Sequence, residues 1–189
     1  MKKQLSAKAI LIPTISLFLI CLVVTALLAL TNNVTADKIK ENEEQNKQNS
    51  MQTVMPDAAD FEEIEEDVMY LAKDNDGNTV GYAISTATQG YGGQVKVMTG
   101  IDTKGEIVGV DVFYNDDETP GLGKNTSNES FRDQYKGLSA DSEIHVSKDS
   151  SDGQTVDAVT SATISSRAVT KAVNEACELY NEYTKKEAK

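Results

Sequence analysis

An uncharged apolar segment near the N-terminus constrains this chain of 189 residues more than any other feature. Residues 10–30 read ILIPTISLFLICLVVTALLAL and contain no charged side chain. A helix rises about 1.5 Å per residue, so a helix over this segment is about 31 Å long and matches a bilayer core of about 30 Å. The segment therefore predicts a transmembrane helix, and residues 51–189 are enough for one ordinary domain.

The charges that flank the apolar segment predict its orientation. Lys2, Lys3 and Lys8 precede it, and the first charged residue after it is Asp37. The positive-inside rule then places residues 1–9 in the cytoplasm and the main domain outside it. The membrane crossed by the helix would be the cytoplasmic (inner) membrane of a cell.

Two alternatives to a retained anchor remain open. A cleaved signal peptide would use residues 34–36 as a weak cleavage site, but the apolar run exceeds the usual signal core of about 7–15 residues. A lipoprotein signal would end at Cys21, but the bulky Ile20 stands where a small residue is wanted. We therefore favour a single-pass anchor.

The charge balance excludes one class of partner and indicates a spacer. The chain has 18 Lys and Arg residues against 30 Asp and Glu residues, a net charge of −12. Nucleic-acid phosphates need a cationic face, so we expect no nucleic-acid partner. The negative charge is concentrated in residues 37–74, and we expect residues 31–50 to form an acidic, solvated stalk.

Cysteine and histidine usage excludes two further classes. Cys21 lies in the membrane segment and Cys177 near the C-terminus, so the two residues cannot form a disulfide scaffold. We expect Cys177 to be a buried thiol. His145 is the single histidine, which argues against a histidine-rich metal site; we expect it on a strand surface and expect no metal ligand.

Alternating apolar residues predict an antiparallel sheet in the domain. Four segments alternate in this way: residues 68–72, 79–85, 95–101 and 108–112. Turns rich in Asp, Asn and Gly separate the first pair and the last pair, as in hairpins. The following stretch is a loop over 115–128, then a short helix over 130–135 and a short strand at 144–146.

The last element has helical periodicity. Apolar residues from Ile164 to Tyr180 recur at intervals of three and four, with charged residues on the other faces. These apolar residues share one face of the predicted helix. The predicted class is α+β, with one membrane helix, an antiparallel sheet and a C-terminal helix.

Three segments contain more hydroxyl, Gly and Pro residues than plain structure requires. The first, residues 157–166, opens the C-terminal helix with several hydroxyls. Thr160, Ser161 or Thr163 would serve as an N-cap in the structural interpretation. In the functional interpretation, the unpaired N–H groups of the helix start attract a phosphate.

The other two segments are glycine-rich. Residues 118–123 read ETPGLG, in which Gly121 and Gly123 permit a positive φ or the close approach of a flat ligand. Residues 90–93 read GYGG and lie between two strand signals. Each segment also fits a simpler structure, a Gly/Pro turn for the former and a flexible hairpin loop for the latter.

Together these segments resemble a known family of membrane-anchored FMN-binding domains. Residues 157–163 are similar to its flavinylation motif, in which an Asp lies six residues before an acceptor Thr. Residues 118–123 resemble the flavin-facing loop in the G subunit of the Rnf ion-translocating electron-transport complex and in the C subunit of the sodium-pumping NADH:quinone reductase. The compact length favours the Rnf G subunit. Ser161 stands where the motif usually has Gly.

The resemblance implies a covalent cofactor and names its acceptor. FMN would be attached through a phosphoester to the hydroxyl of Thr163, and a separate flavin transferase would install it from FAD with Mg²⁺. The segment that the transferase would recognise comprises Asp157, Thr160, Ser161 and Ala162.

The resemblance also implies which residues surround the cofactor. The backbone N–H groups of Ser165 and Ser166 would hold the phosphate. The following residues would line the flavin ring: Glu118, Thr119, Gly121, Leu122, Gly123 and Tyr91. Lys124 and Lys148 are candidates to face negative charge on the flavin, and no catalytic acid or base is expected.

The implied function is that of an electron-carrying subunit. Its partners would be other membrane and iron–sulfur subunits of a complex that couples ferredoxin:NAD⁺ oxidoreduction to Na⁺ or H⁺ translocation, with no independent catalysis by this chain. One alternative is a free-standing membrane-anchored flavoprotein that delivers electrons to extracellular acceptors. Another is a non-redox surface domain, which would be colourless.

Overall fold

The computed structural model describes residues 7–150 and 153–187. Lys2 and Lys3, on which the predicted orientation partly depends, lie outside the described residues. Contacts divide the chain into two units, Met1–Glu44 and Gln45–Lys189.

The first unit contains most of helix α1 (Ala7–Val54). The large apolar side chains of its predicted membrane segment, from Ile10 to Leu30, are all exposed. The helix is long and apolar enough to cross a bilayer, and the hydroxyl of Thr14 donates back to the carbonyl oxygen of Ile10 within the helix. Such exposed apolar surface is stable in lipid rather than in water.

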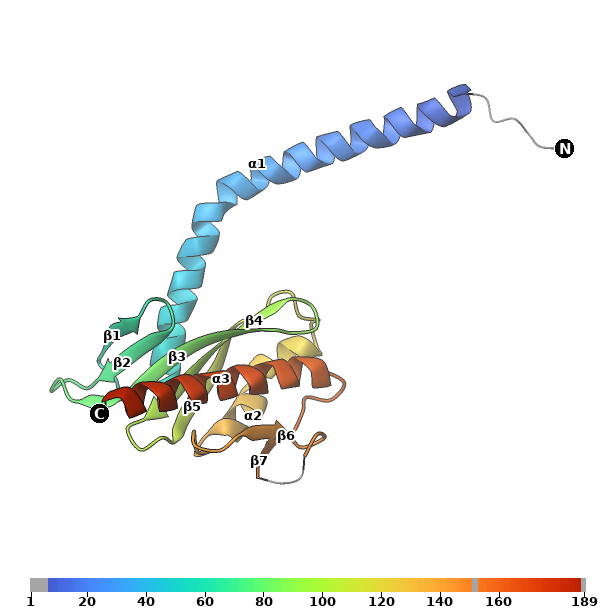
Figure 1. Ribbon diagram of the computed structural model, residues 1–189. Helices are drawn as coiled ribbons and strands as arrows, with labels where there is room; N and C mark the ends of the chain where they lie inside the picture. Colours follow the sequence, from blue (N-terminus) through green and yellow to red (C-terminus); the bar gives the residue numbers. More distant parts are fainter. Residues whose placement is uncertain (1–6, 151–152, 188–189) are drawn as a thin grey trace. The chain divides into compact units, whose positions relative to one another are not determined.

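The second unit is built on a five-stranded antiparallel sheet in which each strand pairs with the next one along the chain (Figure 1). The strands are β1 (Asp60–Glu65), β2 (Met69–Lys73), β3 (Thr79–Gln89), β4 (Gln94–Asp102) and β5 (Ile107–Tyr114). The four predicted segments correspond to β2 to β5. The edge strand β1 was not predicted, because its sequence DFEEIE is mostly acidic and mostly exposed.

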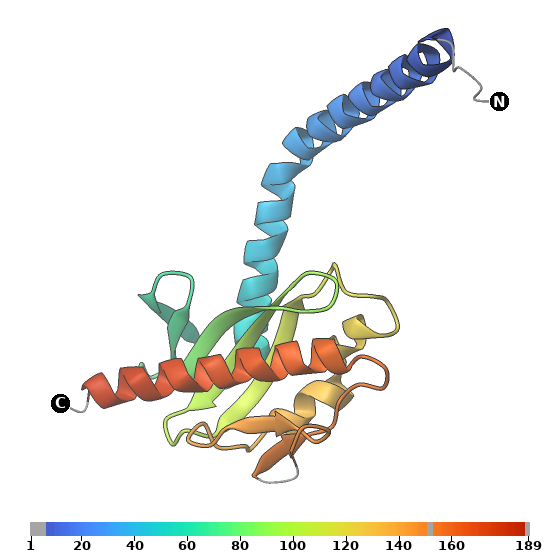
Figure 2. The same ribbon diagram turned by 45° about the vertical axis from the view of Figure 1, so that its right-hand side comes forward.

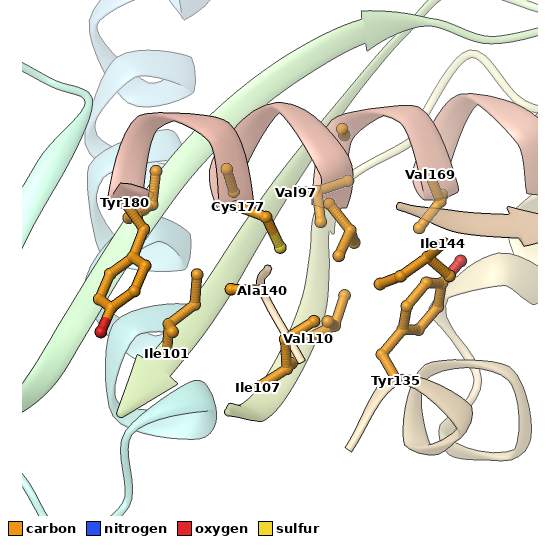
Figure 3. Packing of buried hydrophobic residues seen from close by; sticks show 14 of the residues in the cluster. Val97, Ile101, Ile107, Val110, Tyr135, Ala140, Ile144, Val169, Cys177 and Tyr180 are labelled. Carbon is orange, nitrogen blue, oxygen red and sulfur yellow. The ribbon is translucent and has the colours of Figure 1, made fainter. Parts of the chain in front are cut away.

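One face of the sheet is covered by helix α3 (Thr163–Glu187), which lies along it (Figures 1 and 2). Alternate residues of the strands point to this face, as Val97 and Ile101 do, and meet the apolar stripe of the helix around Cys177 (Figure 3). The amphipathic pattern of the sequence therefore corresponds to the largest core of the domain.

Two buried hydrogen bonds join α3 to strand β3 of the sheet. The hydroxyl of Thr86 donates to the carbonyl oxygen of Ala172 over 2.9 Å, and that of Thr88 donates to the carbonyl oxygen of Ala168 over 2.8 Å. Both acceptors lie on residues with small side chains, which let the helix backbone come within reach of the strand.

The opposite face of the sheet is covered by the last turns of α1. Met51, Val54 and Met55 are buried there with Met98 of β4. Gly100 leaves the space that the helix end needs, since a Cβ atom at this position would overlap the carbonyl oxygen of Val54. The helix therefore continues without a break through the segment expected to be a stalk and ends within the domain.

Short elements connect β5 to α3. In chain order they are η1 (Gly123–Ser127), α2 (Glu129–Arg132), η2 (Asp133–Tyr135), β6 (Ile144–Val146) and β7 (Gln154–Val156). The predicted short helix and short strand are present as α2 with η2 and as β6. The strand β7 and its parallel pairing with β6 were not predicted, because a three-residue strand carries no periodic signal.

Candidate functional site

A pocket of about 500 Å³ lies where three segments distant in the sequence meet. These are the turn between β3 and β4, the loop after β5 and the first turn of α3. The lining residues are Tyr91, Glu118, Thr119, Leu122, Gly123, Ser161, Ala162, Thr163, Ile164 and Ser165. The volume is within the range of small-molecule sites, about 300–1,000 Å³. The structure thus brings together the three motifs that the sequence presents separately.

The buried carboxylate of Glu118 joins the three segments. One oxygen, Oε1, accepts from the backbone N–H groups of Tyr91 (2.7 Å) and Gly92 (3.2 Å) in the β3–β4 turn. The other oxygen, Oε2, accepts from the hydroxyl of Ser165 in α3 (2.7 Å). The side chain is only 2% exposed, so the carboxylate replaces water with protein donors on both sides.

Two glycines pack directly against this carboxylate. A Cβ atom at Gly90 would overlap Oε1 of Glu118, and a Cβ atom at Gly123 would overlap Oε2. One glycine of each loop motif is therefore explained by close approach to the carboxylate of Glu118, a reason that could not be read from the sequence.

The first turn of α3 presents free backbone donors to the pocket. The N–H groups of Thr163, Ile164 and Ser165 have no acceptor among the described residues, as expected for the start of a helix. Within that part of the chain, no hydroxyl of the predicted N-cap residues accepts from them; the hydroxyl of Thr163 accepts instead from Nζ of Lys148 over 3.3 Å. Backbone N–H groups that are left unpaired at a helix start attract anions.

Ser161 adopts a left-handed conformation, with φ of +62°. This position precedes the predicted acceptor Thr163 by two residues and is the one where the flavinylation motif has Gly. A left-handed φ is unfavourable for a residue with a Cβ atom and is readily adopted by Gly. The backbone conformation thus gives a physical reason for the glycine of the motif.

Four of the predicted site residues lie outside this pocket. Gly121, Asp157 and Thr160 line a neighbouring groove of about 540 Å³ instead. The carboxylate of Asp157 accepts from the hydroxyl of Ser147 over 2.7 Å. Ser166 is fully buried.

The structure uses Ser166 differently from the expectation that its N–H group holds a phosphate. That N–H group donates to the carbonyl oxygen of Ala162 over 2.9 Å, and the hydroxyl accepts from the N–H group of Val159 over 3.0 Å. Ser166 therefore shapes the turn before α3, because its donor is already used within the helix start.

Exposed apolar side chains surround the mouth of the pocket. Tyr91, Leu122 and Ile164 are 70%, 40% and 53% exposed. Within the described part of the second unit, they are the large apolar side chains that remain exposed. Ile164 belongs to the apolar series predicted for this helix but is exposed, because it lies in the first turn of α3 at the mouth of the pocket. No sequence signal separates it from the buried stripe.

The cations near the helix start differ in their availability. Arg167 forms a two-point ion pair with Asp149, and the guanidinium lowers the pKa of that exposed carboxyl below its usual range. Lys124 lies 3.3 Å from Asp116. Lys148 is the cation in contact with the Thr163 hydroxyl. His145 lies in β6 and is half-exposed, as expected for a strand surface.

Two family models match the chain. The FMN-binding domain family matches residues 90–178, which include all three motifs. The RnfG N-terminal region matches residues 1–54, which end where α1 ends.

Relatives match the chain over nearly its full length. It is 37% identical to the G subunit of the Na⁺-translocating ferredoxin:NAD⁺ oxidoreductase complex of Acetobacterium woodii, over 97% of this chain and 98% of that protein. It is 32% identical to the G subunit of the proton-translocating ferredoxin:NAD⁺ oxidoreductase complex of Clostridium ljungdahlii, over 90% of this chain and 89% of that protein.

A solved structure shares the fold. The C subunit of the Na⁺-translocating NADH-quinone reductase of Parabacteroides distasonis superposes with a TM-score of 0.58 and 18% identity, over 75% of this chain and 94% of that chain. At this identity the likeness shows the architecture of the domain and nothing about its ligands.

Proposed function

The chain belongs to the RnfG family, the G subunits of ion-translocating oxidoreductase complexes, and from this premise we propose that it carries electrons on an FMN bound in the pocket at the start of α3. Membership makes it a redox subunit of a membrane complex. The observation that carries the proposal is the convergence, in one pocket, of free helix-start donors, an acceptor hydroxyl and the exposed apolar side chains of the domain.

The chemistry of the pocket fits the parts of FMN. The flat, largely apolar ring matches the mouth formed by Tyr91, Leu122 and Ile164. The phosphate matches the N–H groups at the start of α3, with Lys148 nearby to balance its charge. The flavin supplies the redox chemistry, while the protein binds, orients and shields it.

We infer that Thr163 carries the phosphate as an ester. Its half-buried hydroxyl lines the pocket and stands at the first residue of α3. During maturation the hydroxyl oxygen would attack the FMN phosphorus of FAD, AMP would leave, and the hydroxyl proton would be released; a flavin transferase with Mg²⁺ would promote this step. A phosphoester keeps the cofactor on a domain that, by our proposed topology, faces away from the cytoplasmic flavin pool.

We assign electron carriage to this protein and ion translocation to the complex as a whole. The relatives from Acetobacterium woodii and Clostridium ljungdahlii are named for different ions, Na⁺ and H⁺. The proposed partners are the other membrane subunits and the iron–sulfur subunits of a ferredoxin:NAD⁺ oxidoreductase. Residues 10–30 would anchor the protein by a single pass, with the N-terminus in the cytoplasm.

Expression with a flavin transferase tests the attachment. The wild-type chain should stay fluorescent under ultraviolet light after denaturing electrophoresis and should gain the mass of one FMN phosphoester. Thr163→Val should lose both signals, because it removes the acceptor oxygen and keeps the shape of the side chain.

The matched control is Thr155→Val, an exposed threonine of β7 that lies outside the pocket. It should keep both signals. Fluorescence that survives in Thr163→Val would refute the acceptor assignment, and a bare polypeptide in the wild type would refute covalent attachment.

A further inference from the structure

We propose that Glu118 holds the β3–β4 turn in place and that its buried negative charge lowers the reduction potential of the flavin. The inference rests on the proposed function, because it assumes that FMN occupies the pocket which Glu118 lines. It assigns to this residue an electrostatic role beyond lining the ring.

The donor set around Glu118 matches an ionised carboxylate. Three donors point at its two oxygens: the N–H groups of Tyr91 and Gly92 and the hydroxyl of Ser165. The two N–H groups can only donate, and an ionised carboxylate accepts from all three donors at once. The arrangement therefore suits the anion.

No cation in the described ranges 7–150 and 153–187 forms an ion pair with Glu118. Two lysines close to the motifs contact other groups: Lys124 forms an ion pair with Asp116, and Lys148 donates to the hydroxyl of Thr163. Helix α3 begins two residues before Ser165, and the positive end of its dipole helps to stabilise the anion. These dipoles stabilise the carboxylate but do not neutralise it, so Glu118 keeps a net negative charge at the pocket.

Such an arrangement is costly for folding, which suggests a purpose. A buried carboxylate without a cation loses its hydration, and a neutral amide of the same shape would accept the same two backbone donors. Two glycines keep the space around the oxygens free, so the position is enforced by the surrounding backbone. Rules of stability are broken most often at functional sites.

Reduction adds electrons to the flavin ring, and a fixed negative charge close to the ring in a poorly hydrated pocket makes this addition less favourable. The expected consequence is a lower midpoint potential than a neutral side chain would give. The hydrogen bonds to Tyr91 and Gly92 have a second consequence, since they hold Tyr91 at the mouth of the pocket.

The potential test uses the full-length flavinylated chain in detergent. Glu118→Gln should raise the reduced-to-oxidised ratio of the flavin about tenfold at a fixed ambient potential, which equals about 30 mV for a two-electron couple. The matched control is Asp117→Asn, the same chemical change at an exposed neighbour, where solvent screens the charge. It should change the ratio less than about threefold.

A second variant separates charge from position. Glu118→Asp keeps the charge but is one methylene too short to reach both segments. It should leave the ratio close to that of the wild type, whereas backbone hydrogen exchange at Tyr91 and Gly92 in the flavin-free chain should become faster. Glu118→Gln should leave that exchange nearly unchanged.

The outcomes distinguish this inference from the proposed function. A flavin-loaded Glu118→Gln chain with an unchanged ratio would overturn the electrostatic role, and so would an equal shift in Glu118→Asp. Exchange that is no faster in Glu118→Asp would overturn the positioning role. Failure of the wild type to acquire FMN would instead refute the proposed function.

Discussion

The two faces of the sheet are covered by helices in different ways. On the α3 face, small residues on the helix let its backbone approach the strands, and hydroxyls of β3 donate to its carbonyl oxygens. On the α1 face, the space is made by glycine in the sheet, and flexible methionines such as Met51 and Met98 fill the remainder.

The difference suggests different roles for the two contacts: the α3 face positions its helix, whereas the α1 face only attaches its helix. Hydrogen bonds are directional, so the α3 face fixes the translation and rotation of the helix that carries the pocket at its start. Methionine adapts to irregular gaps, so the α1 face buries the helix end without specifying it as tightly. The candidate pocket lies at the start of the helix that is held by directional contacts.

The strongest test of the α1 face adds one methyl group. We expect Gly100→Ala to lower the free energy of unfolding by about 3 kcal/mol, because the new Cβ atom would overlap the backbone of Val54. Urea denaturation of the full-length chain in detergent measures this loss. Gly109→Ala is the graded control: its Cβ atom would lie 3.2 Å from Cα of Val54, and we expect about 1 kcal/mol. Equal, small effects would mean that the helix end moves freely on this face.

The next test probes how tightly the α3 face is closed. Cys177 is 4% exposed, and burial raises the pKa of its thiol from 9.0 to about 12. In a Cys21→Ser chain at pH 8, we expect iodoacetamide to alkylate Cys177 at least about a hundredfold more slowly in the folded than in the urea-unfolded state, because the thiolate is the nucleophile.

The same shift predicts the sign of a pH effect. The pKa is higher in the folded state, so the folded state retains the proton. The stabilising contribution of the neutral thiol is complete below pH 9 and is lost as the pH rises toward 12. A Cys177→Ala chain should lack this alkaline component. In the alkylation test, similar rates in the folded and the urea-unfolded states would show that α3 opens readily from the sheet.

A smaller effect is expected from one directional contact of the α3 face. Thr86→Val removes the donor to the carbonyl oxygen of Ala172 and keeps the volume, so we expect a loss of about 1 kcal/mol in the free energy of unfolding. The control is Thr79→Val, an exposed threonine of the same strand, which should change stability little. A loss no larger than that of the control would mean that directional hydrogen bonds do not distinguish the α3 face from the α1 face.

Much of the architecture was predictable because period-two and helical patterns are strong over β2 to β5 and α3. Edge strand β1 escaped prediction because its stability comes from pairing with β2, in the register Glu62 to Leu71, and not from its own acidic residues. The pocket motifs were recognisable as segments, but their convergence was not. Ile164 shows why: helical periodicity says which residues share a stripe, whereas the point where the sheet ends decides which of them stay exposed.

The smallest expected effect concerns the turn that leads into α3. Ser161→Gly should raise the free energy of unfolding of the flavin-free chain by about 0.5 kcal/mol, because the left-handed φ of +62° is unfavourable for serine and Gly relieves it, with part of the gain offset by the flexibility of glycine in the unfolded chain. Ser161→Ala keeps the Cβ atom and should show no gain. Ser161→Gly should also be flavinylated at least as fast as the wild type. A loss of stability in Ser161→Gly would mean that the serine side chain, and not the backbone conformation, holds the start of α3 in place.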